Sequence, residues 1–221
     1  MPTETFFHLP EDKKERIISA ALIEFAKYSY PSVVLDKIVQ DAEIPKGSLY
    51  QYFRDKKDLY SYLVEYAARE KLAYLAPLLK PEEDSLYDVL EVLFYSSMEY
   101  NLSHPRTSGI LYRNARERSD PVLSDISAGL LGQANDMMRQ VLARAQERGK
   151  LRDGLDIETA ALLIIHLSIE FEDYLGDKYN FSYRDVLDRE LYSLPVPPED
   201  LKNETRQFIR FILAGLEQKT T

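Results

Sequence analysis

The sequence predicts an all-α fold. Apolar residues recur at helical spacing in one stretch after another, with charged residues between them, and prolines stand between the stretches. The 221 residues include eleven prolines but only eight glycines, as expected for helices joined by short loops. Hydrophobic residues make up 45% of the chain, which is enough for a sizeable core.

Four helices are expected in the first eighty residues, over about 10–28, 35–42, 45–53 and 55–77. Pro10 precedes an acidic pair that suits the positive end of the first helix dipole, and Pro31 lies beyond the end of that helix. Pro45 suits the first turn of the third helix, because that position needs no backbone N–H. Asp55 is placed to cap the fourth helix.

Further helices are expected over about 84–103, 106–118, 120–148, 156–178 and 198–218, with a weaker pattern over 183–192. Pro105 and Pro121 separate the first three of these, Gly149 and Gly154 separate the next two, and a proline-rich loop leads into the last. No internal repeat is evident.

Two short helical patterns lie between Ile38 and Lys57, and neither is long enough to be stable alone. Small, polar, aromatic and basic side chains follow the turn between them. This arrangement is typical of a helix-turn-helix whose second helix enters the major groove of DNA. Gly47 and Ser48 keep the first turn of that helix slim. Gln51, one turn after Ser48, has the donor and acceptor that an adenine edge requires.

Candidate phosphate donors flank these groove-reading residues. Tyr50 and Tyr52 carry hydroxyl groups of the kind that reach phosphate oxygens, and Lys56 adds an ammonium at the start of the fourth helix. Lys46 can donate to a base or to a phosphate. Tyr52 could instead pack in the core of the domain, so its side chain has two possible roles.

Residues 46–53, together with 56–59, closely resemble the TetR family of bacterial transcriptional regulators. Residues 149–161 are also similar to the start of the penultimate helix in that family. The resemblance implies a three-helix helix-turn-helix DNA-binding domain at 1–55 and a helical regulatory, ligand-binding and dimerisation domain at 56–221. It assigns DNA contacts to Lys46, Gly47, Ser48, Tyr50, Gln51, Tyr52 and Lys56.

Three features depart from the family's pattern. The turn usually carries glycine where Glu43 stands, so Glu43 is expected in a left-handed conformation or in a different turn. Val33 and Val34 occupy the place where a threonine commonly starts the second helix, which leaves Ser32 as the nearest cap. Asp36 stands where a basic residue often faces DNA, and its carboxylate would repel phosphate. These departures concern the operator sequence and the DNA affinity rather than the fold.

Charge is unevenly distributed along the chain, whose net charge is −9. Residues 1–60 hold nine Lys and Arg against ten Asp and Glu, a balance of −1, whereas residues 61–221 hold 19 against 27, a balance of −8. The acidic excess therefore belongs to the larger C-terminal part. Basic positions near the N-terminus remain able to attract phosphate.

Several classes of function are disfavoured. The chain has no cysteine, and its sequence has no glycine-rich phosphate loop, no Gly-x-Ser-x-Gly motif and no Glu-x-x-His pair. His166 and Glu170 lie four residues apart and could bind a metal, form an acid–base pair or share a buried hydrogen bond. The lack of a wider cluster leads us to expect no catalytic residues, no cofactor and no metal site.

A membrane location is also disfavoured. The longest apolar run, at residues 160–169, has about ten residues against the roughly 20 that cross a bilayer. No basic segment followed by an apolar run is visible at the N-terminus, so no signal peptide is expected. We therefore expect a cytoplasmic protein without membrane partners.

The C-terminal part carries many of the sixteen tyrosines and nine phenylalanines of the chain. In TetR-type regulators the corresponding helices enclose a ligand pocket, and aromatic side chains with a few polar tips suit an amphipathic small molecule. Plain core packing is the alternative. The resemblance implies a pocket drawn from Phe94, Tyr95, Met98, Tyr112, Met137 and His166.

The expected last helix carries an apolar stripe that is wider than packing on one side requires, and the helix at 156–178 is similarly rich. The family dimerises through the equivalent helices as a four-helix bundle. Burial within one chain is the alternative. The expected dimer contacts are Ile165, Ile169, Phe208 and Ile212.

Together these features predict a homodimeric transcriptional repressor that binds an inverted-repeat operator in double-stranded DNA. Release from the operator would follow the binding of a small apolar or amphipathic molecule to the C-terminal domain. The alternative function is a DNA-bound protein-interaction module of the same fold that does not respond to a small molecule.

Overall fold

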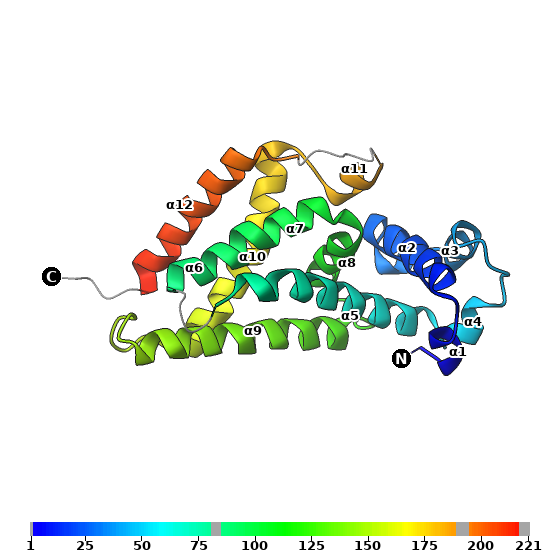
Figure 1. The fold of residues 1–221 in the computed structure, drawn as a ribbon, viewed down its shortest axis with the longest axis horizontal. Coiled ribbons are helices and arrows are strands. Elements are labelled where there is room, and N and C mark those ends of the chain that lie inside the picture. The colour runs from blue at the N-terminus through cyan, green and yellow to red at the C-terminus, as the bar shows by residue number, and fades with distance from the viewer. Residues whose placement is uncertain (1, 81–84, 189–194, 217–221) are drawn as a thin grey trace. The chain divides into compact units, whose positions relative to one another are not determined.

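The computed structural model describes residues 2–80, 85–188 and 195–216, which form helices and no strand (Figure 1). The prediction of an all-α fold is confirmed. The α-helices are α1 (Glu4–Phe7), α2 (Glu11–Lys27), α3 (Leu35–Asp41), α4 (Leu49–Tyr52), α5 (Lys56–Leu75), α6 (Leu86–Glu91), α7 (Ser97–Ser103), α8 (Pro105–Arg116), α9 (Ser124–Glu147), α10 (Ile157–Tyr179), α11 (Tyr183–Asp188) and α12 (Pro198–Leu216). Two short 3-10 segments, η1 (Tyr30–Ser32) and η2 (Ala76–Leu78), and a π-helix, η3 (Val92–Ser96), complete the regular structure.

Most predicted helices are found within a few residues of their expected ends, although the expected ends at 84, 192 and 218 lie outside the described residues. One start is corrected. The sequence predicts the third helix from Pro45, but α4 begins at Leu49, because residues 45–48 form a turn in which the Ser48 N–H donates to the Pro45 carbonyl at 2.8 Å. Residues 4–7 precede the first helix that the sequence predicts, and they form the short helix α1.

The chain packs as two compact units. The first holds the described residues of 1–72, 104–127 and 182–191, and the second holds those of 73–103, 128–181 and 192–221. Each unit therefore combines segments that lie far apart in the sequence. This is a division by packing, and the functional boundary expected after residue 55 stays a prediction.

The first unit is built around α2, which packs against α3, α8 and α11. Ile17 and Phe25 on α2, Ile38 on α3 and Leu59 on α5 are all buried, as their helical spacing predicts. The Phe25 ring meets the buried Tyr60 ring edge-on, with 5.2 Å between the ring centroids. This core fixes the helices that lead to the helix-turn-helix.

The second unit is held by a larger apolar core drawn from α6, α7, α9, α10 and α12. Its centre is a cluster of three rings. Phe208 on α12 stacks on Phe171 of α10 at 4.6 Å and meets Phe94 of η3 edge-on at 5.1 Å. Asp156 caps α10 by accepting the Glu158 N–H at 3.1 Å. Among the described residues, no helix combines the length and the apolar character needed to span a membrane.

Candidate nucleic-acid interface

Two backbone hydrogen bonds at the end of α3 fix the conformation of the turn that follows it. The N–H of Glu43 donates to the Gln40 carbonyl at 3.1 Å and the N–H of Ile44 donates to the Val39 carbonyl at 3.2 Å. These two bonds form a Schellman motif, in which the residue directly after the C-cap adopts a left-handed conformation. Glu43 takes that conformation, with φ of 54°, which is one of the two alternatives that the sequence left open. The cost of left-handed backbone for a residue with a side chain is about 1–2 kcal/mol.

The start of α3 is stabilised by a hydrogen bond to a residue of α2 rather than by a side-chain cap of its own. Val34 occupies the N-cap position and makes no side-chain cap bond, and the expected cap Ser32 instead accepts a hydrogen bond from the Ser29 hydroxyl at 3.0 Å. The buried carboxylate of Glu24 accepts the Val34 N–H at 3.2 Å. A long-range contact from α2 therefore replaces the threonine cap that the family's pattern would supply.

Lys56 supports the same loop. Its ammonium donates to the carbonyls of Val33 at 2.8 Å and Pro31 at 3.3 Å, and lies 4.9 Å from the centroid of the Tyr30 ring. Partial burial lowers the pKa of Lys56 below its usual value, and the negative charge of Glu24 opposes that shift. The sequence predicts a phosphate contact for Lys56; in this structure its ammonium is engaged with the protein.

A row of exposed residues lies along the turn and one side of α4, where the sequence predicts contacts with DNA. Lys46, Gly47 and Gln51 are exposed, Ser48 is half-buried, and the Tyr50 side chain is 61% exposed. The opposite side of the helix is closed, because Leu49, Tyr52 and Phe53 are buried. An additional Cβ at Gly47 would meet nothing within 4 Å, so the packing of the chain itself does not require glycine there.

Tyr52 takes the alternative role that the sequence left open. It lies only 3% exposed on the inner side of α4, with its ring centroid 6.1 Å from that of Phe6, and the Lys13 ammonium lies 5.7 Å from its centroid. The spacing of 49, 52 and 53 is that of one helix face, which is why these three side chains point inward together. The ring of Tyr52 therefore packs in the core, and the phosphate contact of its hydroxyl group stays a prediction.

The segment that holds the end of α4 is not foreseen from the sequence. The Thr3 N–H donates to the Tyr52 carbonyl at 2.9 Å, and the Thr3 hydroxyl donates to the Gln51 carbonyl at 2.7 Å. Behind them, the fully buried Phe6 ring lies 4.9 Å from Phe53. Because the last carbonyls of a helix lack partners within it, α1 completes the short reading helix.

Residues 104–127 add a second set of contacts to the helices of this unit, also unforeseen from the sequence. Arg113 on α8 donates through Nε to the Ala26 carbonyl at 2.8 Å and through Nη2 to the Lys27 carbonyl at 2.7 Å. Glu117 accepts the Tyr30 N–H at 2.9 Å. A guanidinium at the end of α2 is favourable, because it satisfies terminal carbonyls and faces the negative end of the helix dipole.

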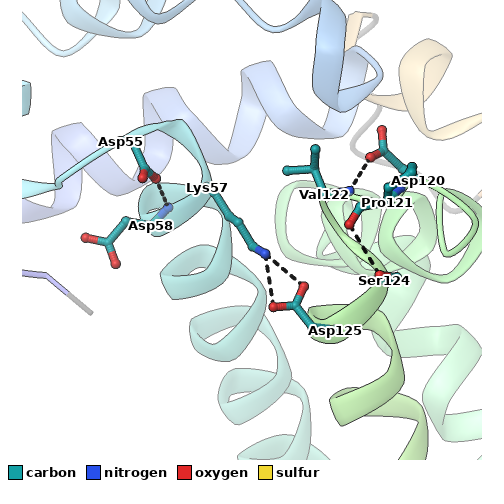
Figure 2. Close-up of polar contacts among 8 residues, drawn as sticks. All are labelled: Asp55, Lys57, Asp58, Asp120, Pro121, Val122, Ser124 and Asp125. Carbon is teal, nitrogen blue, oxygen red and sulfur yellow. Dashed lines mark hydrogen bonds and ion pairs between the residues drawn. The ribbon is translucent and has the colours of Figure 1, made fainter.

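Figure 2 shows a third contact made by residues 104–127, an ion pair with the start of α5. The Lys57 ammonium lies 3.0 Å from both carboxylate oxygens of Asp125, and this bond lowers the pKa of Asp125. Nearby, Asp55 accepts the Asp58 N–H at 2.7 Å, so the predicted cap of α5 is found. Asp120 accepts the Val122 N–H at 2.7 Å and shapes the turn before α9. The first turn of α5 is thus tied to the first turn of α9.

The structure does not gather all of the predicted pocket residues in one unit. Phe94, Tyr95 and Met98 lie in or beside the core of the second unit, with Phe94 and Met98 buried. Met137 is half-buried on α9, whereas its neighbour Met138 is fully buried. Tyr112 lies in the first unit instead, under the Arg116 guanidinium at 3.7 Å. His166 belongs to the second unit, where its Nδ1 lies 2.8 Å from the Leu162 carbonyl of its own helix.

The predicted dimer contacts are mostly internal to one chain. Ile165 and Ile212 are buried in the core of the second unit, Phe208 stacks on Phe171, and Ile169 is half-buried. The spacing of the stripe on α12 therefore identified its core-facing side. Exposed apolar side chains on α10 and α12 are instead Leu162, Leu163, Tyr174 and Phe211.

A short reading helix set on a buried three-helix core, joined to a larger helical unit, defines a helix-turn-helix transcriptional regulator. Residues 17–63 match the family model described as bacterial regulatory proteins, tetR family. The chain is 30% identical over 154 residues to the transcriptional regulator AcuR of Cereibacter sphaeroides, covering 66% of this chain and 68% of that protein. The chain belongs to the TetR family.

Two further relatives agree with this assignment. The chain is 24% identical over 161 residues to the HTH-type transcriptional repressor SCO4008 of Streptomyces coelicolor, covering 72% of this chain and 78% of the repressor. The crystal structure of a TetR family transcriptional regulator from Chloroflexus aurantiacus is 28% identical, with a TM-score of 0.80 over 99% of this chain and 100% of that one. The protein is thus a DNA-binding transcriptional regulator, and its relatives are regulators rather than enzymes.

Proposed function

We propose that this protein is a homodimeric repressor that binds an inverted-repeat operator through α4 and the turn before it. A small, mostly apolar or amphipathic molecule, bound in the second unit, would release it. The observation that carries the proposal is the reading surface formed by Lys46, Gly47, Ser48, Tyr50 and Gln51.

Gly47 supports the DNA-binding role most directly. Its side of the turn is exposed, and an added Cβ would meet nothing within 4 Å. The fold therefore has no need of glycine at this position, whereas a turn that approaches base edges closely has such a need. Gln51, exposed one turn later, supplies an amide that can pair with an adenine edge.

The test begins with duplexes selected from a random pool by the purified chain. Gly47→Ala should leave the melting temperature unchanged and weaken binding to the selected operator at least tenfold, because the new methyl group enters the space of the DNA. Gly132→Ala, at an exposed glycine of α9 with equally open space, is the matched control. Unchanged operator binding by Gly47→Ala would show that this turn does not approach DNA.

Exposed apolar side chains support the homodimer. Leu162 and Leu163 on α10 are 44% and 55% exposed, and Phe211 on α12 is 73% exposed. These side chains belong to the two helices through which the family is expected to dimerise. Covering them with a second copy would remove apolar area from water, which is the main driving force of such association.

Unsatisfied polar atoms in the second unit support a ligand with one or two polar groups. The Thr205 hydroxyl and the Asn101 Oδ1 are buried and have no hydrogen-bond partner in the part of the chain that the structure describes. Each such atom costs about 1–3 kcal/mol, so a bound molecule that supplied a partner would gain affinity. The π-helix η3, which contains Phe94 and Tyr95, adds a feature that is frequent at functional sites.

A screen of apolar and aromatic compounds for thermal stabilisation tests the effector proposal. Each hit is then titrated against the complex with the selected operator. Thr205→Val keeps the shape of the side chain and removes the hydroxyl, so it should preserve the fold and weaken the hits. Compounds that stabilise the protein and never change its DNA affinity would favour the rival function, a regulator that answers to another macromolecule.

A further inference from the structure

An ion pair spans the reading surface itself. The Lys46 ammonium, which immediately precedes Gly47, lies 2.6 Å from the Asp36 carboxylate in the first turn of α3. Both side chains are open to solvent, with 75% of Lys46 and 63% of Asp36 exposed. The pair thus joins the start of α3 to the turn before α4, on the side that the proposed function turns toward DNA.

The short distance between Lys46 and Asp36 limits which groups can bind there. Any acceptor that the Lys46 ammonium binds from this conformation lies no farther from the Asp36 carboxylate oxygen than the sum of two hydrogen-bond lengths. A phosphate there would be attracted by the one group and repelled by the other, so the pair as a whole gives little net attraction. Exposed ion pairs contribute little stability, so Lys46 can leave Asp36 where a better arrangement is offered.

The chemistry of the carboxylate narrows what that arrangement is. An ionised carboxylate only accepts hydrogen bonds. In the major groove the base-edge donors are the amino groups of cytosine and adenine, and the acidic side chains pair with the amino group of cytosine. Guanine and thymine edges offer acceptors at the corresponding places and would be repelled.

Resting on the proposed function, we propose that Asp36 is a specificity-determining residue. In the free protein it withholds Lys46 from phosphate. At the operator it accepts a hydrogen bond from a cytosine amino group and leaves Lys46 free to bind the backbone. On other DNA the carboxylate stays unpaired beside phosphate and weakens binding. Asp36, an acidic residue on a surface proposed to face DNA, therefore discriminates between DNA sequences.

Asp36→Asn tests this directly, since it keeps the shape and removes the charge. The full chain is titrated against its selected operator and against a non-operator duplex of equal length and composition, over a series of salt concentrations. Asp36→Asn should bind the non-operator duplex more tightly, with a salt slope steeper by about 0.9, as expected for one additional phosphate contact. The ratio of operator to non-operator affinity should fall about tenfold, at the low end for one base-edge contact.

The matched control is Asp41→Asn. Asp41 forms an equally short pair, at 2.6 Å, with Lys37 on the same helix, so its removal changes the net charge by the same amount. It should alter both affinities equally and leave their ratio unchanged. Selection from a random pool should give a cytosine at one position per half-site for the wild type and lose that preference for Asp36→Asn.

The outcomes separate the two proposals. If the wild type selects an operator and Asp36→Asn keeps the same affinity ratio and the same selected bases, Asp36 has no role in specificity. Asp36 also has no such role if Asp41→Asn lowers the ratio as much as Asp36→Asn does, since net charge would then explain the effect. A wild type that selects no sequence would overturn the proposed DNA-reading function together with this inference.

Discussion

Removal of the Phe6 ring should separate the stability of the first unit from its ability to bind DNA. Phe6 is fully buried, and its ring centroid lies 4.9 Å from that of Phe53 and 5.3 Å from that of Tyr62. Truncation of a buried phenylalanine to alanine costs about 3–5 kcal/mol when the surrounding structure stays in place. Ordering the backbone of the segment around α1 costs about 1–2 kcal/mol per residue, so its docking is finely balanced.

We therefore expect Phe6→Ala to release α1 rather than to unfold the unit. The loss in the free energy of unfolding should then be smaller than the truncation cost, while operator affinity falls strongly because α4 loses the two hydrogen bonds from Thr3. Urea unfolding followed by circular dichroism gives the first quantity and operator titration gives the second. Hydrogen exchange at the Thr3 amide, which is bonded in the native chain, should become fast.

Phe7→Ala is the matched control, because Phe7 lies on the same short helix and is 52% exposed. Its removal should cost well under about 1 kcal/mol and leave operator binding unchanged. Equal behaviour of the two variants in both assays would refute the role assigned to α1. The role would also be refuted if the Thr3 amide of Phe6→Ala exchanged as slowly as in the native chain.

Three other predictions follow from single contacts. Arg113→Lys keeps the charge but loses the planar guanidinium that binds two carbonyls, so the urea midpoint should fall by the equivalent of about 1–3 kcal/mol. The control Arg144→Lys, at an exposed position of α9, should leave the midpoint unchanged. Phe211→Glu should sediment as a folded monomer and Gln207→Glu as a dimer; a dimeric Phe211→Glu would contradict the proposed interface. Hydrogen bonds in the cap of α6 lower the pKa of Asp88 below its ordinary 3.8. The contribution of Asp88 to the free energy of unfolding is therefore complete above pH 3.8 and is lost as the pH falls through the lowered pKa. Acid unfolding curves should therefore be flatter for Asp88→Asn, and parallel curves would contradict the cap's contribution.

Local signals predicted most helix boundaries because each of them acts over a few residues. Asp55 caps α5, as its position before a periodic stretch indicates. Glu43 is left-handed, as expected for the position where the family's turn carries glycine. Pro105 begins α8 and lacks an N–H at a position that needs none. These effects can be read from sequence alone, since their partners are neighbours along the chain.

Long-range contacts account for what the sequence did not reveal. Arg113 reaches the end of α2 across 86 and 87 residues, and Glu117 reaches Tyr30 across 87. No spacing rule connects residues so far apart. The inward position of Tyr52 is different, because the apolar residues three before and one after it already mark a buried helix face. The burial of its ring could therefore be predicted from the spacing, and the DNA contact of its hydroxyl group stays a prediction.

The length of α4 explains why so many contacts converge on it. A helix of four residues cannot hold itself, since isolated helices shorter than about 12–15 residues are marginal in water. Its position is set by the hydrogen bond from Thr3 at its end, by the burial of its own Leu49 and of the adjacent Phe53, and by the turn in which Glu43 is left-handed. A change in any of these supports alters the reading surface without touching DNA. The affinity for an operator is therefore a property of the whole first unit, including the segment 104–127 that Arg113 ties to α2.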